Sequence, residues 1–237
     1  MPLLRLGNIP VEVRVKPIRH IHLTVHPPTG RVRISAPPRV KLETLRVFAA
    51  SRIGWIRRQQ QQLRNQERET PREFLPKESH FVWGQRRLMR VVYNESKPNV
   101  TLRPGWIDLV VRPGTPRAKK REIVEDWYRS QIRVAADPLI QKWSKKIGVR
   151  VNKVFVQNMK TKWGSCNPQK GFIRLNTELA KKPPSCLEYI VVHELIHLLE
   201  PSHNDRFRSL MAHHMPTWRQ QKDLLRQQPL AHQKWDY

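Results

Sequence analysis

The chain has 237 residues, of which 45 are lysine or arginine and 19 are aspartate or glutamate, so its formal net charge is +26 at pH 7. Hydrophobic residues make up 38% of the chain and recur in periodic blocks, which excludes a wholly disordered protein. The charge excess is +10 in residues 1–70, +10 in 71–150 and +6 in 151–237, which excludes a basic tail as its origin. Such a charge favours a polyanionic partner: nucleic acid, a nucleotide or an acidic membrane surface.

Cysteine content and hydropathy indicate where the protein works. Cys166 and Cys186 are too few for a disulfide framework. No stretch approaches the roughly 18 apolar residues that a membrane span needs. The first residues also lack the apolar core of a signal peptide. The expected location is a reducing cytoplasm.

The first half of the chain has the patterns of a small antiparallel sheet with one helix. Apolar residues alternate with polar ones over 11–37 and predict a hairpin. Over 42–65 the apolar spacing changes to three and four residues, which is typical of an amphipathic helix. Short strands are then predicted at 80–83, 87–93, 99–103 and 106–112.

The best candidate boundary is the Pro113–Pro116 segment, because proline and glycine cluster there. After it we expect a helix at 118–147, kinked or broken at Pro138, strands at 149–156 and 172–179, and helices at 185–199 and 203–213. No internal repeat is visible. The predicted fold class is α+β, with a β-rich N-terminal region (1–115) and a catalytic region (116–237) that are separate domains or one continuous unit.

The sharpest chemical signal is the segment His193-Glu194-Leu195-Ile196-His197, inside an apolar-periodic helix. Residues four apart share one face of a helix, so both imidazoles can reach one metal ion. Glu194 is rotated off that face, where it can act on a water at the metal without binding the ion. We therefore predict a metal site with His193 and His197 as ligands and Glu194 as the catalytic base.

A hydrolytic zinc site needs a third protein ligand and one open position. Ser202 is a good N-cap, and His203 follows it at the start of the next predicted helix, ten residues after His193. A chain reversal at Pro201 can bring His203 over the other two imidazoles. Glu200 is the alternative third ligand. The expected cofactor is one Zn²⁺ per chain.

Three segments make the sequence resemble the YgjP-like metallopeptidase family: 162–166 (KWGSC), 173–176 (IRLN) and 189–195 (YIVVHEL), together with His203. The resemblance is best over about 155–210 and extends to 11–63. It implies a zincin-like catalytic unit with His193, His197 and His203 as zinc ligands and Glu194 as base.

The sequence departs from this family in its length, in the basic region 95–121 and in the tail beyond Pro216. The resemblance therefore implies no structure or function for those parts. The histidine spacing equals that of the metzincins, but Glu200 stands where their glycine belongs. The distantly similar SprT-like zinc proteases share the motif and a link to DNA.

Several other residues are weaker candidates for a functional role, because residues of these types more often have a structural role. Trp163, Ser165, Asn176, His213 and His214 are candidates for substrate contact or for support of the metal ligands. Cys166 is a candidate nucleophile or fourth ligand, although a lone cysteine in such a turn is more often packed. The densest basic run offers candidate phosphate contacts: Arg117, Lys119, Lys120 and Arg121.

The leading functional prediction is a zinc metallopeptidase that hydrolyses amide bonds with a zinc-activated water and Glu194 as base. The same ion and base can cleave a phosphoanhydride, so a nucleoside triphosphate pyrophosphohydrolase is the second prediction. A third is a nucleic-acid-binding module with a structural or vestigial metal site. The expected partners are a peptide, protein or nucleotide substrate, and nucleic acid bound without sequence preference through residues 1–150.

Overall fold

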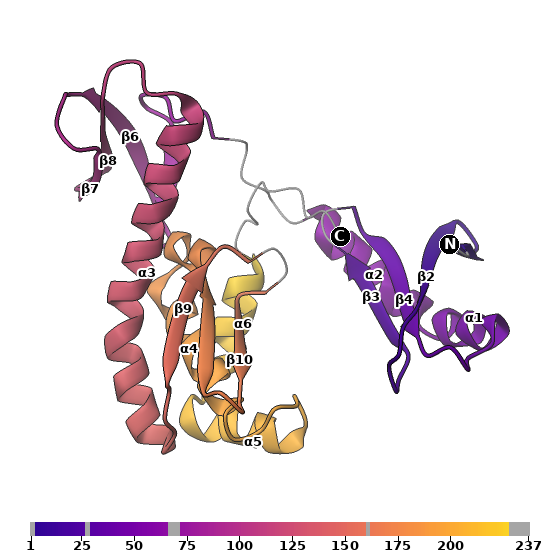
Figure 1. The fold of residues 1–237 in the computed structure, drawn as a ribbon. Helices are drawn as coiled ribbons and strands as arrows, with labels where there is room; N and C mark the ends of the chain where they lie inside the picture. The colour runs from indigo at the N-terminus through magenta and orange to yellow at the C-terminus, as the bar shows by residue number, and fades with distance from the viewer. Residues whose placement is uncertain (1–2, 27–28, 66–71, 160–161, 228–237) are drawn as a thin grey trace. The chain divides into compact units, whose positions relative to one another are not determined.

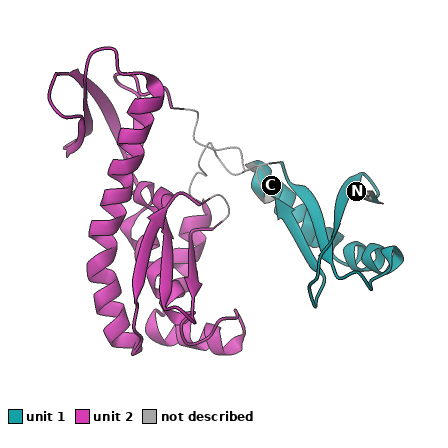
Figure 2. Cartoon of the chain, viewed as in Figure 1, with its two compact units in different colours: residues 1–69, 229–237 teal, residues 70–228 magenta. Residues whose placement is uncertain are grey.

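A computed structural model describes residues 3–26, 29–65, 72–159 and 162–227, which form two compact units (Figure 2). The residues up to 65 belong to unit 1, and residues 72–227 belong to unit 2. Both units combine helices with sheets, which confirms the α+β fold class. Within these described ranges, no helix has the length and apolar character needed to cross a membrane.

Unit 1 is a four-stranded sheet with two helices. Its strands are β1 (Leu3–Leu6), β2 (Ile9–Val15), β3 (His22–His26) and β4 (Arg31–Ala36), in the order β1-β2-β4-β3. The alternation of valine with charged residues in β2 places Val11 and Val13 in the core, against Leu45 and Ile56 of the helices. The predicted single helix is in fact two, α1 (Leu42–Ala50) and α2 (Ile53–Asn65).

Unit 2 begins with a second four-stranded sheet. Its strands are β5 (Ser79–Val82), β6 (Gln85–Tyr93), β7 (Asn99–Arg103) and β8 (Trp106–Val111), close to their predicted positions. The order β5-β6-β8-β7 repeats that of unit 1, with a parallel central pair (β2/β4 and β6/β8) between two antiparallel edges. Both sheets are therefore mixed, not purely antiparallel, and the chain repeats a topology that its sequence does not reveal.

A long helix, α3 (Arg117–Ile147), follows β8 and ends at Gly148, whose positive φ terminates the helix (Figure 1). It is assigned as one helix through Pro138, where a break was expected. The remaining elements are β9 (Lys153–Gln157), β10 (Gly164–Asn167), β11 (Phe172–Asn176), the 3₁₀ helix η1 (Thr177–Lys181), α4 (Pro184–Ile196), α5 (Asp205–His214) and α6 (Trp218–Gln227). The last three strands form a sheet of order β10-β11-β9.

The Pro113–Pro116 segment, predicted as the boundary, lies inside unit 2. The physical reason is a shared core: Met89, Ile107 and Leu109 of the sheet are fully buried in the same cluster as Ile132 of α3 and Val191 of α4. A proline-rich turn therefore connects β8 to α3 without separating two domains. The division of the chain falls between residues 65 and 72 instead.

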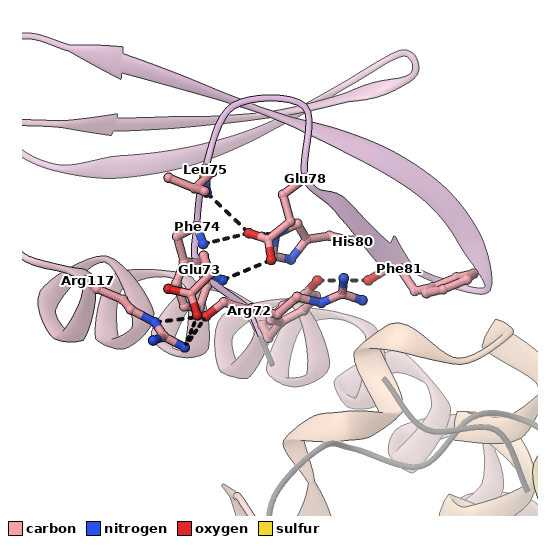
Figure 3. A network of polar contacts seen from close by, with 9 residues as sticks. Arg72, Glu73, Phe74, Leu75, Glu78, His80, Phe81 and Arg117 are labelled. Atoms are coloured by element: carbon pink, nitrogen blue, oxygen red, sulfur yellow. Dashed lines mark hydrogen bonds and ion pairs between the residues drawn. The ribbon is translucent and has the colours of Figure 1, made fainter. Parts of the chain in front are cut away.

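The first described residues of unit 2 are held by a polar network around Glu78 (Figure 3). The Glu78 carboxylate accepts hydrogen bonds from the backbone N–H groups of Glu73, Phe74 and Leu75, at 2.9, 2.6 and 3.2 Å. Arg117, at the start of α3, donates to the carbonyl of Arg72 and pairs with Glu73 at 2.8 Å. These bonds attach the segment 72–75 to the sheet and to α3.

We expect a fragment of residues 70–228 to fold alone, because its core contains no residue of unit 1. A fragment that starts at Arg117 should not fold. This shorter fragment loses six buried apolar side chains: Phe74, Val82, Met89, Ile107, Leu109 and Val111. Burial of each side chain contributes about 1.5–3 kcal/mol to stability, whereas the total free energy of unfolding of a domain is about 5–15 kcal/mol. Thermal unfolding followed by circular dichroism compares the two fragments, and a cooperative transition in the shorter one would contradict this prediction.

Candidate metal centre and its cleft

The histidine motif lies on α4, a helix buried on nearly every side. Pro184 occupies its first turn, where the missing N–H costs nothing. Leu187, Val191 and Leu195 are almost fully buried. The helix contacts α3, α5, α6, η1, β10 and β11. An apolar helix in this position fixes the side chains at its C-terminal end.

Three imidazoles converge at that end of α4. His193 and His197 lie one turn apart, and His203 lies in the connection to α5. The Nε2 atom of His203 is 3.0 Å from the Nε2 atoms of both His193 and His197. Asn204, and not Ser202, is the N-cap of α5, and its side chain accepts from the N–H of Phe207 at 2.9 Å. His203 therefore precedes α5 instead of opening it.

This geometry fits a zinc ion. Nitrogen ligands at ~2.0–2.1 Å in a tetrahedral site lie roughly 3.3–3.4 Å from one another, close to the separation here. The Nδ1 atom of His197 is 3.0 Å from the carbonyl oxygen of Glu200, so an N–H donated there leaves Nε2 free as a ligand. Burial, and the neighbouring His197 and His203, lower the pKa of His193 to about 3, which keeps its imidazole neutral. Neutral imidazoles are the form that binds a metal.

Phe207 of α5 packs against the whole cluster. Its ring centroid is 4.9 Å from that of His193, 4.6 Å from that of His197 and 4.8 Å from that of His203. The side chain is buried. Phe207 therefore limits the rotation of all three imidazoles, a role that its position in the sequence does not reveal.

Glu194 is buried beside the cluster. Burial raises the pKa of its carboxyl to about 8, and Oε2 has no hydrogen-bond partner among the described residues. Gly164, the first residue of β10, lies against this carboxylate: a Cβ there would be 2.5 Å from Oε1. A buried polar atom without a partner, next to three convergent imidazoles, is compatible with a site for a metal and a water.

Glu200, the alternative third ligand, is not part of the cluster, which consists of His193, His197 and His203. Its carboxylate accepts hydrogen bonds from the N–H of Ser202 at 3.2 Å and from the hydroxyl of Ser202 at 2.8 Å. The geometry thus favours His203 over Glu200.

A cleft of about 620 Å³ opens over the cluster. Strand β10 pairs only with β11 in the described sheet and is therefore an edge strand. Gly164, Ser165 and Cys166 of β10 line the cleft. Strand β11 lies between β10 and β9 and is the central strand of this sheet. The other lining residues are Lys162, Trp163, Pro168, Tyr189, Ile190, His193, Glu194, His197, Pro201, His203, Lys222, Leu225 and Arg226.

Of the five weaker candidates for substrate contact or ligand support, two line the cleft and three do not. Trp163 and Ser165 line the cleft. Asn176 is buried instead and donates to the carbonyls of Met159 and Lys162, both at 2.8 Å, so it holds the segment that leads into β10. His213 and His214 lie at the end of α5 with ring centroids 4.8 Å apart, and neither lines the cleft.

Cys166 has little nucleophilic character. Burial and the nearby Glu194 raise the pKa of its thiol to about 11, which keeps it protonated at neutral pH. It does not belong to the histidine cluster.

The basic run at the start of α3 is partly engaged within the protein. Arg117 binds Arg72 and Glu73, and Lys119 pairs with Glu122 at 2.7 Å. Lys120 lies over the Tyr93 ring, 5.4 Å from its centroid, and Arg121 is exposed. None of the four lines the cleft.

Sequence reasoning missed the contribution of α6, which supplies Lys222, Leu225 and Arg226 to the cleft. It also missed Tyr189, whose hydroxyl has a pKa raised to about 12 by burial. A signal was available for Tyr189, because it precedes His193 by four residues and must share its helix face. No comparable signal marks α6, since it lies in the tail after Pro216.

The chain is similar to known proteins over part or most of its length. One solved structure similar to part of the chain is that of the metallopeptidase zymogen jannalysin from Methanocaldococcus jannaschii, with 19% identity and a TM-score of 0.33, covering 37% of this chain and 90% of that one. No curated protein matches the chain. The sequence model of the YgjP-like metallopeptidase domain matches residues 19–228, including the basic region 95–121 and most of the tail after Pro216. Because this match spans most of the sequence, the chain belongs to the YgjP-like metallopeptidase family.

Proposed function

We propose that the protein is a zinc-dependent metallopeptidase with His193, His197 and His203 as ligands and Glu194 as the catalytic base. The observation that carries this proposal is the convergence of three imidazole Nε2 atoms beside a buried carboxylate without a hydrogen-bond partner. A purely structural metal site has no need of such a carboxylate. Family membership supports a metal-dependent hydrolase.

Each residue has a distinct part in the proposed reaction. A bound zinc ion supplies a positive charge that polarises the scissile carbonyl and acidifies water. Glu194 takes the proton of the attacking water and delivers it to the leaving amine. Its position in the lining of the cleft suits both steps, because the same carboxylate can accept the proton and then release it. Phe207 holds the three imidazoles in place.

Strand β10 supplies a binding surface for a peptide backbone. An edge strand has N–H and C=O groups available on one side, and an extended peptide can pair with them. Because Gly164 contacts Glu194, a peptide paired along β10 passes beside the catalytic carboxylate. This arrangement favours an extended peptide or protein segment as substrate.

A second candidate function is the hydrolysis of a nucleoside triphosphate to a monophosphate and pyrophosphate. The observation in its favour is that Lys162, Lys222 and Arg226 line the cleft, since cations bind phosphates. The peptide remains the first proposal because the edge strand offers main-chain pairing, which a nucleotide does not use.

Nucleic acid is proposed as an additional partner on the basis of the net charge of +26. Arg14 and Arg33 lie on the sheet of unit 1, and Arg90 and Arg103 on that of unit 2, but each of the four pairs with Glu12 or Asp108. The expected binding is therefore weak, without sequence preference and strongly reduced by salt.

The test is to measure metal content and hydrolysis together. We expect about one zinc per purified chain, and His197→Ala should lose both the metal and the activity because two imidazoles hold zinc poorly. Peptides and nucleoside triphosphates are offered to both proteins, with and without DNA, at ~0.1 M salt, where screening acts over about 10 Å. Wild-type protein that holds zinc but cleaves only triphosphates would contradict the peptidase proposal and support the second candidate.

A further inference from the structure

The cleft carries more positive charge than hydrolysis of a neutral amide requires. Three of its lining residues are cations, Lys162, Lys222 and Arg226, and Glu194 is its one carboxylate. A bound zinc ion would add two further positive charges. A substrate that carries a negative charge would thus enter a favourable field.

The two lysines reach the cleft from different parts of the fold. Lys162 precedes β10 and Lys222 belongs to α6, so the cations flank the cluster from separate elements.

Lys222 is held without a counterion. Its ammonium lies 5.6 Å from the centroid of the buried Trp218 ring, and no carboxylate lies within ion-pair distance of it among the described residues. Burial, and the like charges of Arg226 and Arg219, lower its pKa. Arg226, one turn further along α6, pairs with Asp223 at 3.6 Å. An incoming carboxylate would relieve the repulsion around Lys222.

We propose that Lys222 is a specificity-determining residue of the peptidase proposed above, and this inference rests on that function. Together with Arg226, Lys222 binds a carboxylate of the substrate peptide on the α6 side of the metal site. The carboxylate has two possible sources, an aspartate or glutamate side chain close to the scissile bond, or the free C-terminus of the peptide. Strand β10 aligns the peptide backbone, and the α6 cations select the charge beside it.

The test compares cleavage of matched peptides by the zinc-loaded full chain. One set varies a single position between Glu, Gln and Lys at fixed C-terminal amidation, and a second set compares free with amidated C-termini. We expect wild type to prefer the carboxylate by about tenfold to a hundredfold in kcat/KM, the effect of one charge-assisted hydrogen bond. Lys222→Glu should remove or invert that preference towards Lys.

Lys145→Glu is the matched control: it makes the same charge reversal at an exposed lysine of α3 that does not line the cleft. It should leave the preference unchanged. Lys222→Gln serves if the charge reversal does not fold, and it should reduce the preference while neutral peptides are still cleaved.

The outcomes separate this proposal from the one it rests on. Cleavage without charge preference, or an equal shift in Lys145→Glu, would overturn the role of Lys222 and leave the peptidase function standing. A preference confined to free C-termini would support it and identify the C-terminus as the source of the carboxylate. Hydrolysis of nucleoside triphosphates with no peptide cleaved would overturn both proposals.

Discussion

Glu194→Gln is expected to retain about one zinc per chain and to lose nearly all hydrolysis of peptides. The amide of glutamine has almost the same shape as the carboxylate but cannot accept a proton, so His193, His197 and His203 keep their positions. Removal of a positioned general base typically costs 10²–10⁴-fold in rate, and we expect a loss of about a thousandfold. Metal analysis and kcat/KM on the best peptide substrate measure the two quantities separately.

Glu200→Gln is the matched control for this variant. Glu200 lies just beyond the motif, its carboxylate is bonded to Ser202, and it is not part of the histidine cluster. The change should leave metal content and turnover near those of wild type. A loss of zinc in Glu200→Gln would show that Glu200, and not His203, completes the site. Substantial peptide hydrolysis by Glu194→Gln would remove Glu194 from its proposed role.

Gly164→Ala is expected to reduce kcat/KM by about a hundredfold with the metal still bound. The added Cβ would lie 2.5 Å from Oε1 and 2.8 Å from Cγ of Glu194, so the catalytic side chain must move. Displacement of a catalytic group by about 1 Å costs of the order of 10²-fold in rate. The backbone itself tolerates alanine, because the φ angle of Gly164 lies outside the left-handed region.

Gly54→Ala in α2 gives the comparison for Gly164→Ala. Gly54 also has an ordinary φ angle, and its added Cβ would meet only the Arg58 side chain at 3.6 Å. It lies in unit 1, so hydrolysis should be unchanged. Full activity in Gly164→Ala would mean that Glu194 can move without loss, whereas loss of zinc in this variant would mean that Gly164 supports the ligands and not the base.

Much of the fold could be predicted from the sequence because the signals are local. Alternation with a period of two located the strands of the second sheet, and a spacing of three and four located α3 and α4. Strand β10 was not predicted, because a four-residue segment that contains glycine has no clear alternation of apolar and polar residues. The parallel pairing of the central strands, β2 with β4 and β6 with β8, was not predicted either. The pairing of distant strands depends on contacts that no local sequence pattern encodes.

The domain boundary shows how a local signal can mislead. Pro113, Gly114 and Pro116 form a turn that resembles a linker, but the strands before it and the helix after it share one core. Whether a proline-rich turn separates domains depends on the contacts that cross it, and a sequence does not show them.

The proposed roles of His193, Glu194 and His197 follow from the sequence alone, because their spacing fixes their relative directions on any helix. The groups that surround them depend on the tertiary fold. Chain reversal brings His203 and Phe207 onto the cluster, β10 places Gly164 against Glu194, and α6 adds Lys222 to the cleft. Helical periodicity links residues within one or two turns, whereas these contacts join separate elements and arise only when the shared core is formed.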